Sequence, residues 1–207
     1  MKKRTAKIME LFDENLGTQF PCGLEYSTPY QLLFATIMSA QCTDKRVNIV
    51  TRDLFVKYPT LESFAGASLE ELEEDIRTTG FYHNKAKNII ASARILLAEY
   101  GGEVPSDIDE LTALPGVGRK TANVVRGNVY DIPSVVVDTH VKRVSRRLGL
   151  TKSEDPVVIE KDLMKEYPED HWILINHQFM EFGRNMCTAR APKCERCFAR
   201  EYCKNGK

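Results

Sequence analysis

Four cysteines near the end of the chain carry the strongest chemical signal in the sequence. They are spaced C-x6-C-x2-C-x5-C as Cys187, Cys194, Cys197 and Cys203, and thiols this close are expected to share one centre. A disulfide pairing is disfavoured because thiols stay reduced in the cytosol. Four soft thiolates suit either a tetrahedral zinc ion or a [4Fe–4S] cluster. Zinc sites usually have two C-x2-C pairs and this loop has one, which favours the cluster and leaves zinc open.

A glycine-rich turn between two helical segments is the second signal, and residues 114–123 read LPGVGRKTAN. Gly116 and Gly118 let backbone N–H groups approach an anion, and the N-terminus of the following helix adds its positive dipole. Such a turn can hold a phosphate without reading a base. It is not a nucleotide-binding P-loop, because its glycines are too close together and Lys120 does not follow a glycine. Alone, the pattern also suits a simple connection between helices.

Basic residues are concentrated in two segments, although the net charge is +0, with 29 basic and 29 acidic residues. Residues 119–147 and the residues from 184 onward are rich in Lys and Arg. Both segments would suit contacts to phosphates, and solvated helix faces are the commoner reason for such a pattern.

The elements that must position these residues are predicted to be helices, because helix signals occur along most of the chain. Thr28-Pro29 is a cap with proline at the first helical position, and Ser68 opens a capping box whose helix is expected to stop at Gly80. Further helices are expected at residues 84–101, 106–112, 141–148, 155–163 and 172–182. Only residues 134–137 look like a strand, and one short strand has no partner. The predicted fold class is therefore all-α.

The composition is that of a globular protein, with 43% hydrophobic and 28% charged residues. No apolar run approaches the roughly 18 residues that a membrane span needs. The basic start is followed by Glu10, Asp13 and Glu14, where a signal peptide would have an apolar segment. We expect a cytoplasmic protein, with ordinary free thiols at Cys22 and Cys42.

Four segments together resemble a known family: LPGVGRKTAN at 114–123, VDTH at 137–140, SAQCTD at 39–44 and the four-cysteine tail. In this order, over almost the whole chain, they look like the endonuclease III branch of the helix-hairpin-helix DNA glycosylases. The resemblance implies a [4Fe–4S] cluster rather than zinc, and a hairpin that binds DNA.

The resemblance also implies an architecture of two helical domains flanking a DNA-binding cleft. One domain, residues 20–132, would contain the helix-hairpin-helix at about residues 107–128. The other would combine residues 1–19 with residues 133–207 and carry the cluster loop at 187–203. The implied protein is a monomer, associated with the nucleoid if the source is bacterial.

The implied activity is that of a bifunctional DNA glycosylase and AP lyase, which excises oxidised pyrimidines from duplex DNA and cleaves the abasic strand by β-elimination. Lys120 occupies the position of the lysine whose amine attacks C1′ and forms a Schiff base, and an amine must lose its proton before it attacks. Asp138 would activate Lys120 and stabilise positive charge on the sugar. Its simpler role is to cap the helix that follows, and both roles can coexist.

A base inside a duplex cannot be reached, so such an enzyme extrudes it and fills the gap. Gln41 and Phe81 match the gap-filling positions of the family, although position 81 is often a smaller aliphatic and Ala191 stands where a basic residue is common. The expected DNA contacts are made by Gln41, Phe81, Gly116, Gly118, Arg119, His140, Arg190 and Lys193.

Three alternatives remain at this point. An adenine-mismatch glycosylase would have a catalytic glutamate before the glutamine loop, but residues 34–40 read FATIMSA and Lys120 is present. A non-catalytic iron–sulfur protein would bind DNA without releasing a base. A zinc-binding DNA module would be colourless.

Overall fold

The computed structural model describes residues 2–205, and this part of the chain is helical, with no β-strand. The predicted all-α class is confirmed. The α-helices are α1 (Lys3–Leu16), α2 (Pro29–Met38), α3 (Asp44–Lys57), α4 (Leu61–Ala65), α5 (Leu69–Asp75), α6 (Tyr82–Glu99), α7 (Ile108–Ala113), α8 (Arg119–Val129), α9 (Thr139–Leu148), α10 (Pro156–Glu166) and α11 (Trp172–Asn185). Short 3-10 helices are η1 (Arg77–Thr79), η2 (Glu169–His171), η3 (Cys194–Arg196) and η4 (Arg200–Tyr202).

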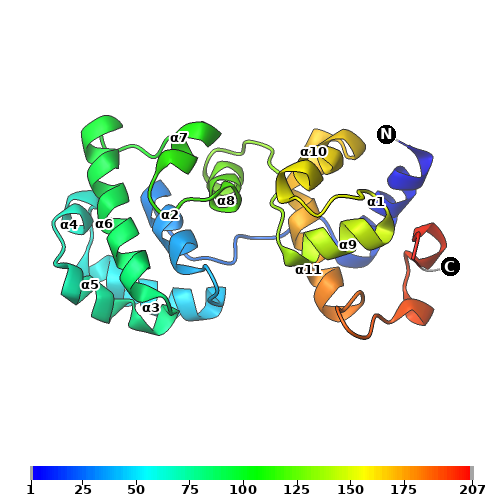
Figure 1. Cartoon of the computed structure of the whole chain (residues 1–207), viewed down its shortest axis with the longest axis horizontal. Coiled ribbons are helices and arrows are strands. Elements are labelled where there is room, and N and C mark those ends of the chain that lie inside the picture. Colours follow the sequence, from blue (N-terminus) through cyan, green and yellow to red (C-terminus); the bar gives the residue numbers. More distant parts are fainter. Residues whose placement is uncertain (1, 206–207) are drawn as a thin grey trace. The chain divides into compact units, whose positions relative to one another are not determined.

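The helices belong to two compact units, which are described separately (Figure 1). The hairpin unit runs from Cys22 to Ile132 and contains α2 to α8. The cysteine unit combines the N-terminal segment up to Pro21 with the segment from Pro133 onward, so that α1 packs with the C-terminal helices.

The hairpin unit is built around α2. Every residue from Gln31 to Met38 is buried, as expected for a helix that is apolar on all sides. Thr28 caps it through a hydrogen bond from the Gln31 backbone N–H at 3.4 Å, and Pro29 is the first helical residue, as predicted. This helix packs against α3, α6 and α8, so it supports both the hairpin and the turns at the ends of its neighbours.

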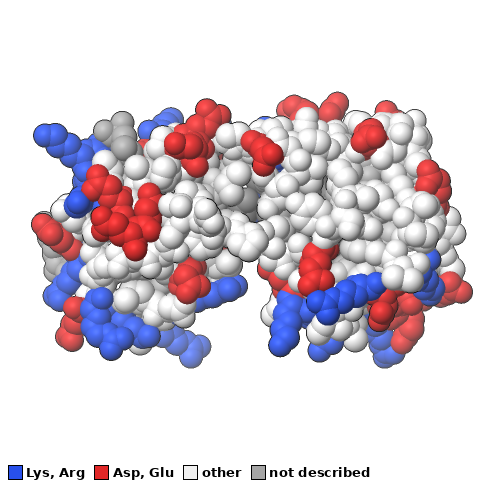
Figure 2. Space-filling view, turned by 180° about the vertical axis from the view of Figure 1, so that it is seen from behind, with Lys and Arg blue, Asp and Glu red and all other residues white. Residues whose placement is uncertain are grey.

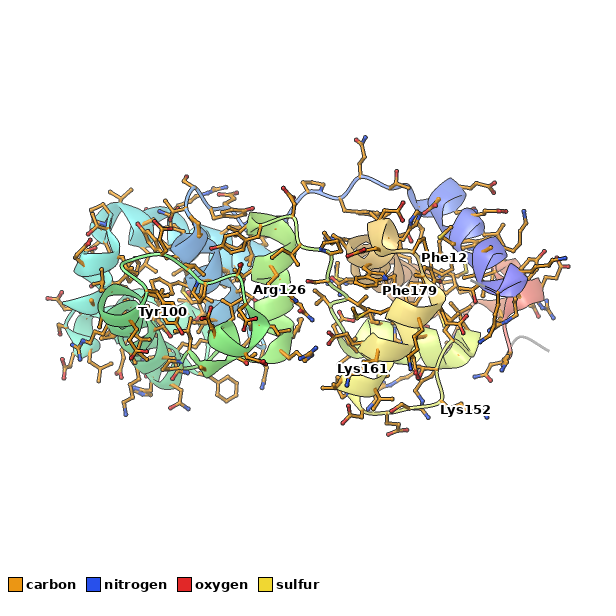
Figure 3. The ribbon with its side chains drawn as sticks, turned by 90° about the horizontal axis from the view of Figure 1, so that it is seen from above. Phe12, Tyr100, Arg126, Lys152, Lys161 and Phe179 are labelled. Carbon is orange, nitrogen blue, oxygen red and sulfur yellow. The ribbon has the colours of Figure 1, made fainter. Side chains whose placement is uncertain are left out.

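The cysteine unit has its own aromatic core. Phe12 of α1 lies 5.1 Å from Phe179 and 4.8 Å from Phe182 of α11, measured between ring centroids. Figure 3 shows Phe12 and Phe179 pointing toward one another. Phe198, in the loop that carries the cysteines, packs on the same Phe12 ring at 5.3 Å. The N-terminal helix α1 therefore packs against the loop that carries the cysteines, through the contact between Phe12 and Phe198.

Two expectations about local structure were wrong in detail, and the view that residues 134–137 have no strand partner was confirmed. The Ser68 cap forms, but α5 ends at Asp75, because the next turn tightens into η1 before Gly80. The helix expected from residue 106 is capped by Asp107, whose Oδ1 accepts from two backbone N–H groups at 2.8 and 3.1 Å. Residues 134–137 form no strand, since no neighbouring strand pairs with them, and the Val136 carbonyl instead accepts from Asn176 at 3.1 Å.

Among residues 2–205, no helix combines the length and the apolar character that crossing a membrane requires.

Candidate active site and cysteine centre

The hairpin turn joins α7 to α8 and is anchored to α6. Leu114 and Val117 are buried, and the Val117 backbone N–H donates to the Leu114 carbonyl at 3.1 Å. Ser92 of α6 is buried and donates from Oγ to the Pro115 carbonyl at 3.0 Å. The apolar residues point inward, so the glycines of the turn face outward.

The two glycines of the turn have different structural reasons to be glycine. Gly116 has a φ of +76°, and a Cβ there would lie 2.6 Å from Nδ2 of Asn88. Gly118 has a φ of −89°, and a Cβ there would meet no atom within 4 Å. The fold therefore requires glycine at position 116. At position 118 a Cβ would contact no other part of the protein, so it would interfere only with a bound ligand.

Lys120 is exposed on the first turn of α8. Gly118 is the N-cap of this helix and has no side chain that could accept a hydrogen bond from the first turn of α8. Uncapped N–H groups at a helix N-terminus bind anions well, because the helix dipole adds to their partial positive charge. An amine and a helix N-terminus that could attract an anion thus lie on the same helical turn.

Asp138 is the N-cap of α9, as predicted. Its Oδ1 accepts from the backbone N–H of His140 at 2.8 Å and of Val141 at 2.7 Å. Both bonds end on one oxygen, so Oδ2 takes no part in the cap. Lys120 belongs to the hairpin unit and Asp138 to the cysteine unit.

His140 is held against α11 by a close approach of two helices. A Cβ on Gly183 would lie 2.7 Å from Nδ1 of His140 and 2.9 Å from Nη2 of Arg143. Nη2 of Arg143 lies 3.1 Å from Nδ1 of His140 and donates to the Gly183 carbonyl at 2.8 Å. Burial lowers the pKa of His140, and Arg143 and Arg184 lower it further, against an opposing effect of Asp138.

The two candidate gap-filling residues lie in strained turns of the hairpin unit. Gln41 is exposed with a φ of 56°, and Phe81 is 65% exposed with a φ of 50°. A core role for Phe81 is therefore excluded. An exposed phenyl ring held on a turn in a left-handed conformation suits a wedge.

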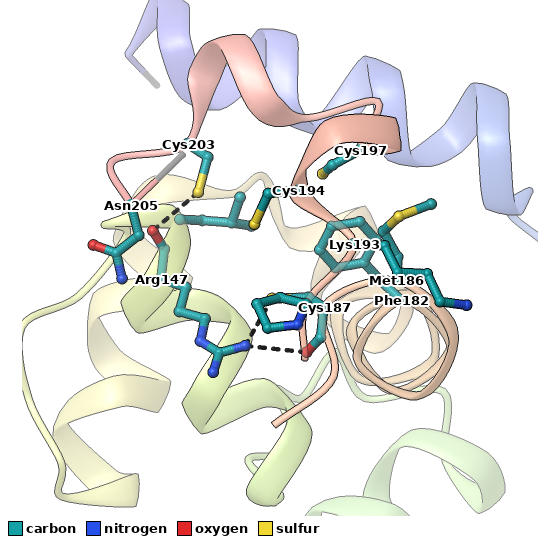
Figure 4. Close-up of a pocket in the computed structure, with 11 residues that line it drawn as sticks. Arg147, Phe182, Met186, Cys187, Lys193, Cys194, Cys197, Cys203 and Asn205 are labelled. Carbon is teal, nitrogen blue, oxygen red and sulfur yellow. Dashed lines mark hydrogen bonds between the residues drawn. The ribbon is translucent and has the colours of Figure 1, made fainter. Parts of the chain in front are cut away.

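The four cysteines of the C-terminal loop line one cavity of about 140 Å³ (Figure 4). Arg147 of α9 reaches across it: Nη1 lies 3.4 Å from Sγ of Cys187 and donates to the Thr188 carbonyl at 2.7 Å. Sγ of Cys203 lies 3.3 Å from the Arg147 carbonyl oxygen. One residue of α9 thus contacts both ends of the loop.

The chemistry of this cavity fits a metal centre held by thiolates. Burial raises the pKa of the Cys197 thiol, and Cys203, Cys187 and Cys194 raise it further, against a backbone hydrogen bond at Ala199 that lowers it, so Cys197 lies within electrostatic reach of the other three cysteines. No disulfide joins any of the cysteines in the described chain. Over residues 2–205 no group of three or more His, Cys, Asp or Glu side chains is arranged so that it could hold a metal ion.

Basic side chains accompany the cysteine loop on the surface. Arg190 and Lys193 are exposed, and neither forms an ion pair within residues 2–205. Figure 2 shows Lys and Arg side chains gathered at the lower left of the view, over the end of the cysteine unit where Figure 1 places the C-terminal segment. This positive surface suits phosphate groups.

Several residues that shape the site were not recognised in that role from the sequence. Asn88 and Ser92 fix the hairpin, and Arg143 and Arg147 fix the cysteine loop, but each acts on a segment distant in the chain. Lys85 is buried, and a lysine on the apolar stripe of α6 was the one available clue.

Comparison with known proteins gives the class first. Residues 34–169 match the family described as "HhH-GPD superfamily base excision DNA repair protein", which is more than half of the chain. The hairpin and the all-helical fold are those of this class, and the chain belongs to the HhH-GPD superfamily.

Individual relatives identify the family within this superfamily. A protein named Endonuclease III from Bacillus subtilis is 46% identical over 204 residues, which cover 97% of this chain and 93% of the relative. One from Synechocystis is 49% identical, with coverage of 98% and 93%. The solved structure titled as a trapped endonuclease III–DNA covalent intermediate has a TM-score of 0.89 at 44% identity and covers 100% of this chain and 98% of its own. This chain is a member of the endonuclease III family.

Proposed function

We propose that this base excision repair enzyme, a DNA glycosylase and lyase, excises oxidised pyrimidines from duplex DNA and uses Lys120 as its nucleophile. The observation that carries the proposal is the placement of an exposed amine on the first turn of α8, beside a helix N-terminus with a glycine N-cap that suits a phosphate. The related structure titled as a trapped covalent intermediate with DNA supports a covalent mechanism.

In the proposed reaction, Nζ of neutral Lys120 forms a bond to C1′ as the glycosidic bond breaks, and the base leaves with the electron pair and takes up a proton. The amine and the opened sugar then form a Schiff base, and loss of the 2′ proton expels the 3′ phosphate by β-elimination. The Asp138 carboxylate stabilises positive charge on the sugar.

The DNA contacts that we propose follow from the same arrangement. Backbone N–H groups at Gly116 and Gly118 hold a phosphate together with Arg119, and Gln41 and Phe81 fill the gap left by the base. Arg190 and Lys193 contact the backbone from the cysteine loop, and His140 does so from the start of α9. In domain terms, residues 20–132 form the hairpin domain, and residues 1–19 with 133–207 form the cluster domain.

We also propose that Cys187, Cys194, Cys197 and Cys203 hold a [4Fe–4S] cluster with a structural and DNA-positioning role. The four sulfurs share one cavity, and four cysteine thiolates are the usual ligands of such a cluster. The cluster would supply a rigid cross-link that fixes Arg190 and Lys193. Metal analysis should find iron rather than stoichiometric zinc, and Cys194→Ser should lose the brown colour that Cys22→Ser keeps.

Borohydride trapping on an abasic duplex tests the nucleophile. Lys120→Gln should still bind damaged DNA but form no covalent complex, whereas Lys161→Gln, an exposed lysine of α10, should trap like the wild type. Trapping of Lys120→Gln at wild-type yield would move the nucleophile elsewhere, for example to the terminal amine of Met1, which lies outside the described residues.

One further variant tests Asp138, and a set of defined duplexes tests the substrate. Asp138→Asn keeps the capping oxygen, so an abasic site should still be trapped, while base release falls roughly 10²–10⁴-fold. Duplexes that each carry one defined lesion identify the substrate. Excision of an adenine from a mismatch, with oxidised pyrimidines untouched, would contradict the proposed specificity.

A further inference from the structure

Three exposed non-glycine residues of the hairpin unit, Gln41, Phe81 and Asp131, have left-handed backbone conformations, which L side chains adopt rarely, and two of them are the candidate gap-filling residues. Gln41 has a φ of 56° and Phe81 a φ of 50°. Gln41 lies in the turn that follows α2, and Phe81 lies between η1 and α6. Such conformations persist only where the surrounding structure holds them. Something in the hairpin unit must therefore fix both turns.

Lys85, on the first turn of α6, bridges the starts of these two turns. Its side chain is 4% exposed, and Nζ donates to the Met38 carbonyl at 2.7 Å and to the Thr79 carbonyl at 2.9 Å. Met38 ends α2 and Thr79 ends η1, so both acceptors are C-terminal carbonyls without a partner in their own helix. One ammonium thus joins the segments that lead to Gln41 and Phe81.

The choice of an amine at this buried position needs a reason. Burial lowers the pKa of Lys85, and the neighbouring Cys42 thiol raises it. Its two acceptors are backbone carbonyls, so no carboxylate offsets the cost of burying the charge. A methionine would fill similar space without that cost. The N–H donors of Lys85 are what the position requires, and their effect is to hold two chain segments together.

We propose that Lys85 is a positioning residue for base extrusion, which couples the Gln41 and Phe81 turns so that both side chains enter the duplex together. This inference rests on the proposed function, in which Gln41 and Phe81 fill the gap left by the extruded base. A single bridge lets neither turn move alone, so both side chains meet the gap in one fixed arrangement. Single-stranded abasic DNA has no gap to fill, so its cleavage does not need the bridge.

Lys85→Met tests this role, with two matched controls on the same helix. Lys87→Met removes an exposed lysine, and Ile89→Ala removes fully buried apolar atoms without touching either carbonyl. Single-turnover excision from a lesion-containing duplex should slow roughly 10- to 100-fold in Lys85→Met. Cleavage of a single-stranded abasic oligonucleotide should keep the wild-type rate, and neither control should separate the two substrates.

A double-mutant cycle then distinguishes positioning from general destabilisation. Gln41→Ala and Phe81→Ala should have coupled effects on duplex excision in the wild-type background. In the Lys85→Met background the two effects should be small and additive, because the turns are no longer held together. In the Ile89→Ala background the coupling should survive. Persistent coupling in Lys85→Met would overturn the proposal.

A second variant covers the case in which Lys85→Met does not fold. Lys85→Gln keeps two N–H donors on a shorter side chain, and it should reduce the coupling and slow duplex excision selectively. Duplex and single-stranded rates that fall equally in Lys85→Gln would also overturn the proposal. A wild-type protein that excises no lesion would instead refute the proposed function, which separates the two failures.

Discussion

At the scale of single residues, the two glycines of the hairpin turn are glycine for different physical reasons. Gly116 is required by its backbone, since its φ of +76° and the adjacent Asn88 leave no room for a side chain. Gly118 has an ordinary conformation and open space around it. The fold places no demand on Gly118, so its lack of a side chain is best explained by the approach of a ligand to the N-terminus of α8.

The two glycines should therefore respond differently to alanine. Gly116→Ala should lower the free energy of unfolding by about 1–2 kcal/mol, because an L residue is forced into a left-handed conformation. Gly118→Ala should leave thermal stability unchanged and weaken binding to duplexes of any sequence. Thermal denaturation and fluorescence anisotropy with an abasic duplex measure the two effects. Wild-type affinity in Gly118→Ala would remove the hairpin as the phosphate site.

At the scale of elements, the pair α9 and α11 connects Asp138, the proposed catalytic aspartate, to the cysteine loop. Asp138 caps α9, and Arg143 on the same helix donates to the carbonyls of Gly183 and Cys187, at 2.8 and 3.1 Å. Arg147 extends the contact to Thr188. The helix that Asp138 caps, α9, thus also positions the cysteine loop. A change in the packing of α9 against α11 should therefore affect both Asp138 and the loop.

Gly183→Ala tests this connection. The added Cβ would collide with the His140 ring and the Arg143 guanidinium, and overpacking of this kind typically costs about 1–3 kcal/mol. Thermal denaturation should show the loss, and the iron content per chain should fall because Arg143 no longer holds the Cys187 carbonyl. Gly66→Ala is the control, since its Cβ would lie at 3.4 Å from one carbonyl. Unchanged stability and iron content would argue against the connection.

The docking of α1 within the cysteine unit depends on a histidine between two aspartates. Nε2 of His171 lies 3.2 Å from Asp13 of α1, and Nδ1 lies 2.6 Å from Asp170. Burial alone would lower the pKa of His171, but the hydrogen bonds that its ring donates to Asp170 and Asp13 outweigh burial and raise the pKa above its ordinary 6.5. Stability from this group is therefore present in full below pH 6.5 and lost as the pH rises through the folded-state pKa.

The difference in melting temperature between the wild type and His171→Gln should accordingly shrink as the pH rises from about 5.5 to about 8.5. His83→Gln is the matched control, because His83 also contacts a carboxylate but its side chain is 64% exposed. A difference that stays constant or grows with pH would show that His171 does not stabilise α1 through its charge.

At the scale of the whole molecule, the net charge of +0 means that attraction to DNA must come from local surfaces. Each phosphate contact contributes about −0.9 to the slope of log K against log salt. Arg190→Ala or Lys193→Ala should each make that slope shallower by about 0.9, with sequence preference unchanged. Lys161→Ala should leave the slope unchanged. If all three variants kept the wild-type slope, the cysteine loop would not contact phosphates.

Features that depend on neighbours in sequence could be predicted without a structure. The caps at Thr28, Asp138 and Asp155 formed as expected, because an N-cap side chain bonds to a backbone N–H only two or three residues ahead. The helical class followed from the same local signals. The end of α5 was missed, since the 3-10 turn that follows depends on how buried Ile76 packs.

Features that depend on distant contacts were decided by tertiary structure alone. Lys85 meets the Met38 carbonyl across 47 positions of sequence, and Arg147 meets Cys187 across 40. The unequal roles of Gly116 and Gly118 also depend on Asn88, from another helix. By itself the sequence determined which groups can do the chemistry, because residue type and short spacing are local properties. Burial, strain and bridging hydrogen bonds arise only when segments far apart in the chain are packed together.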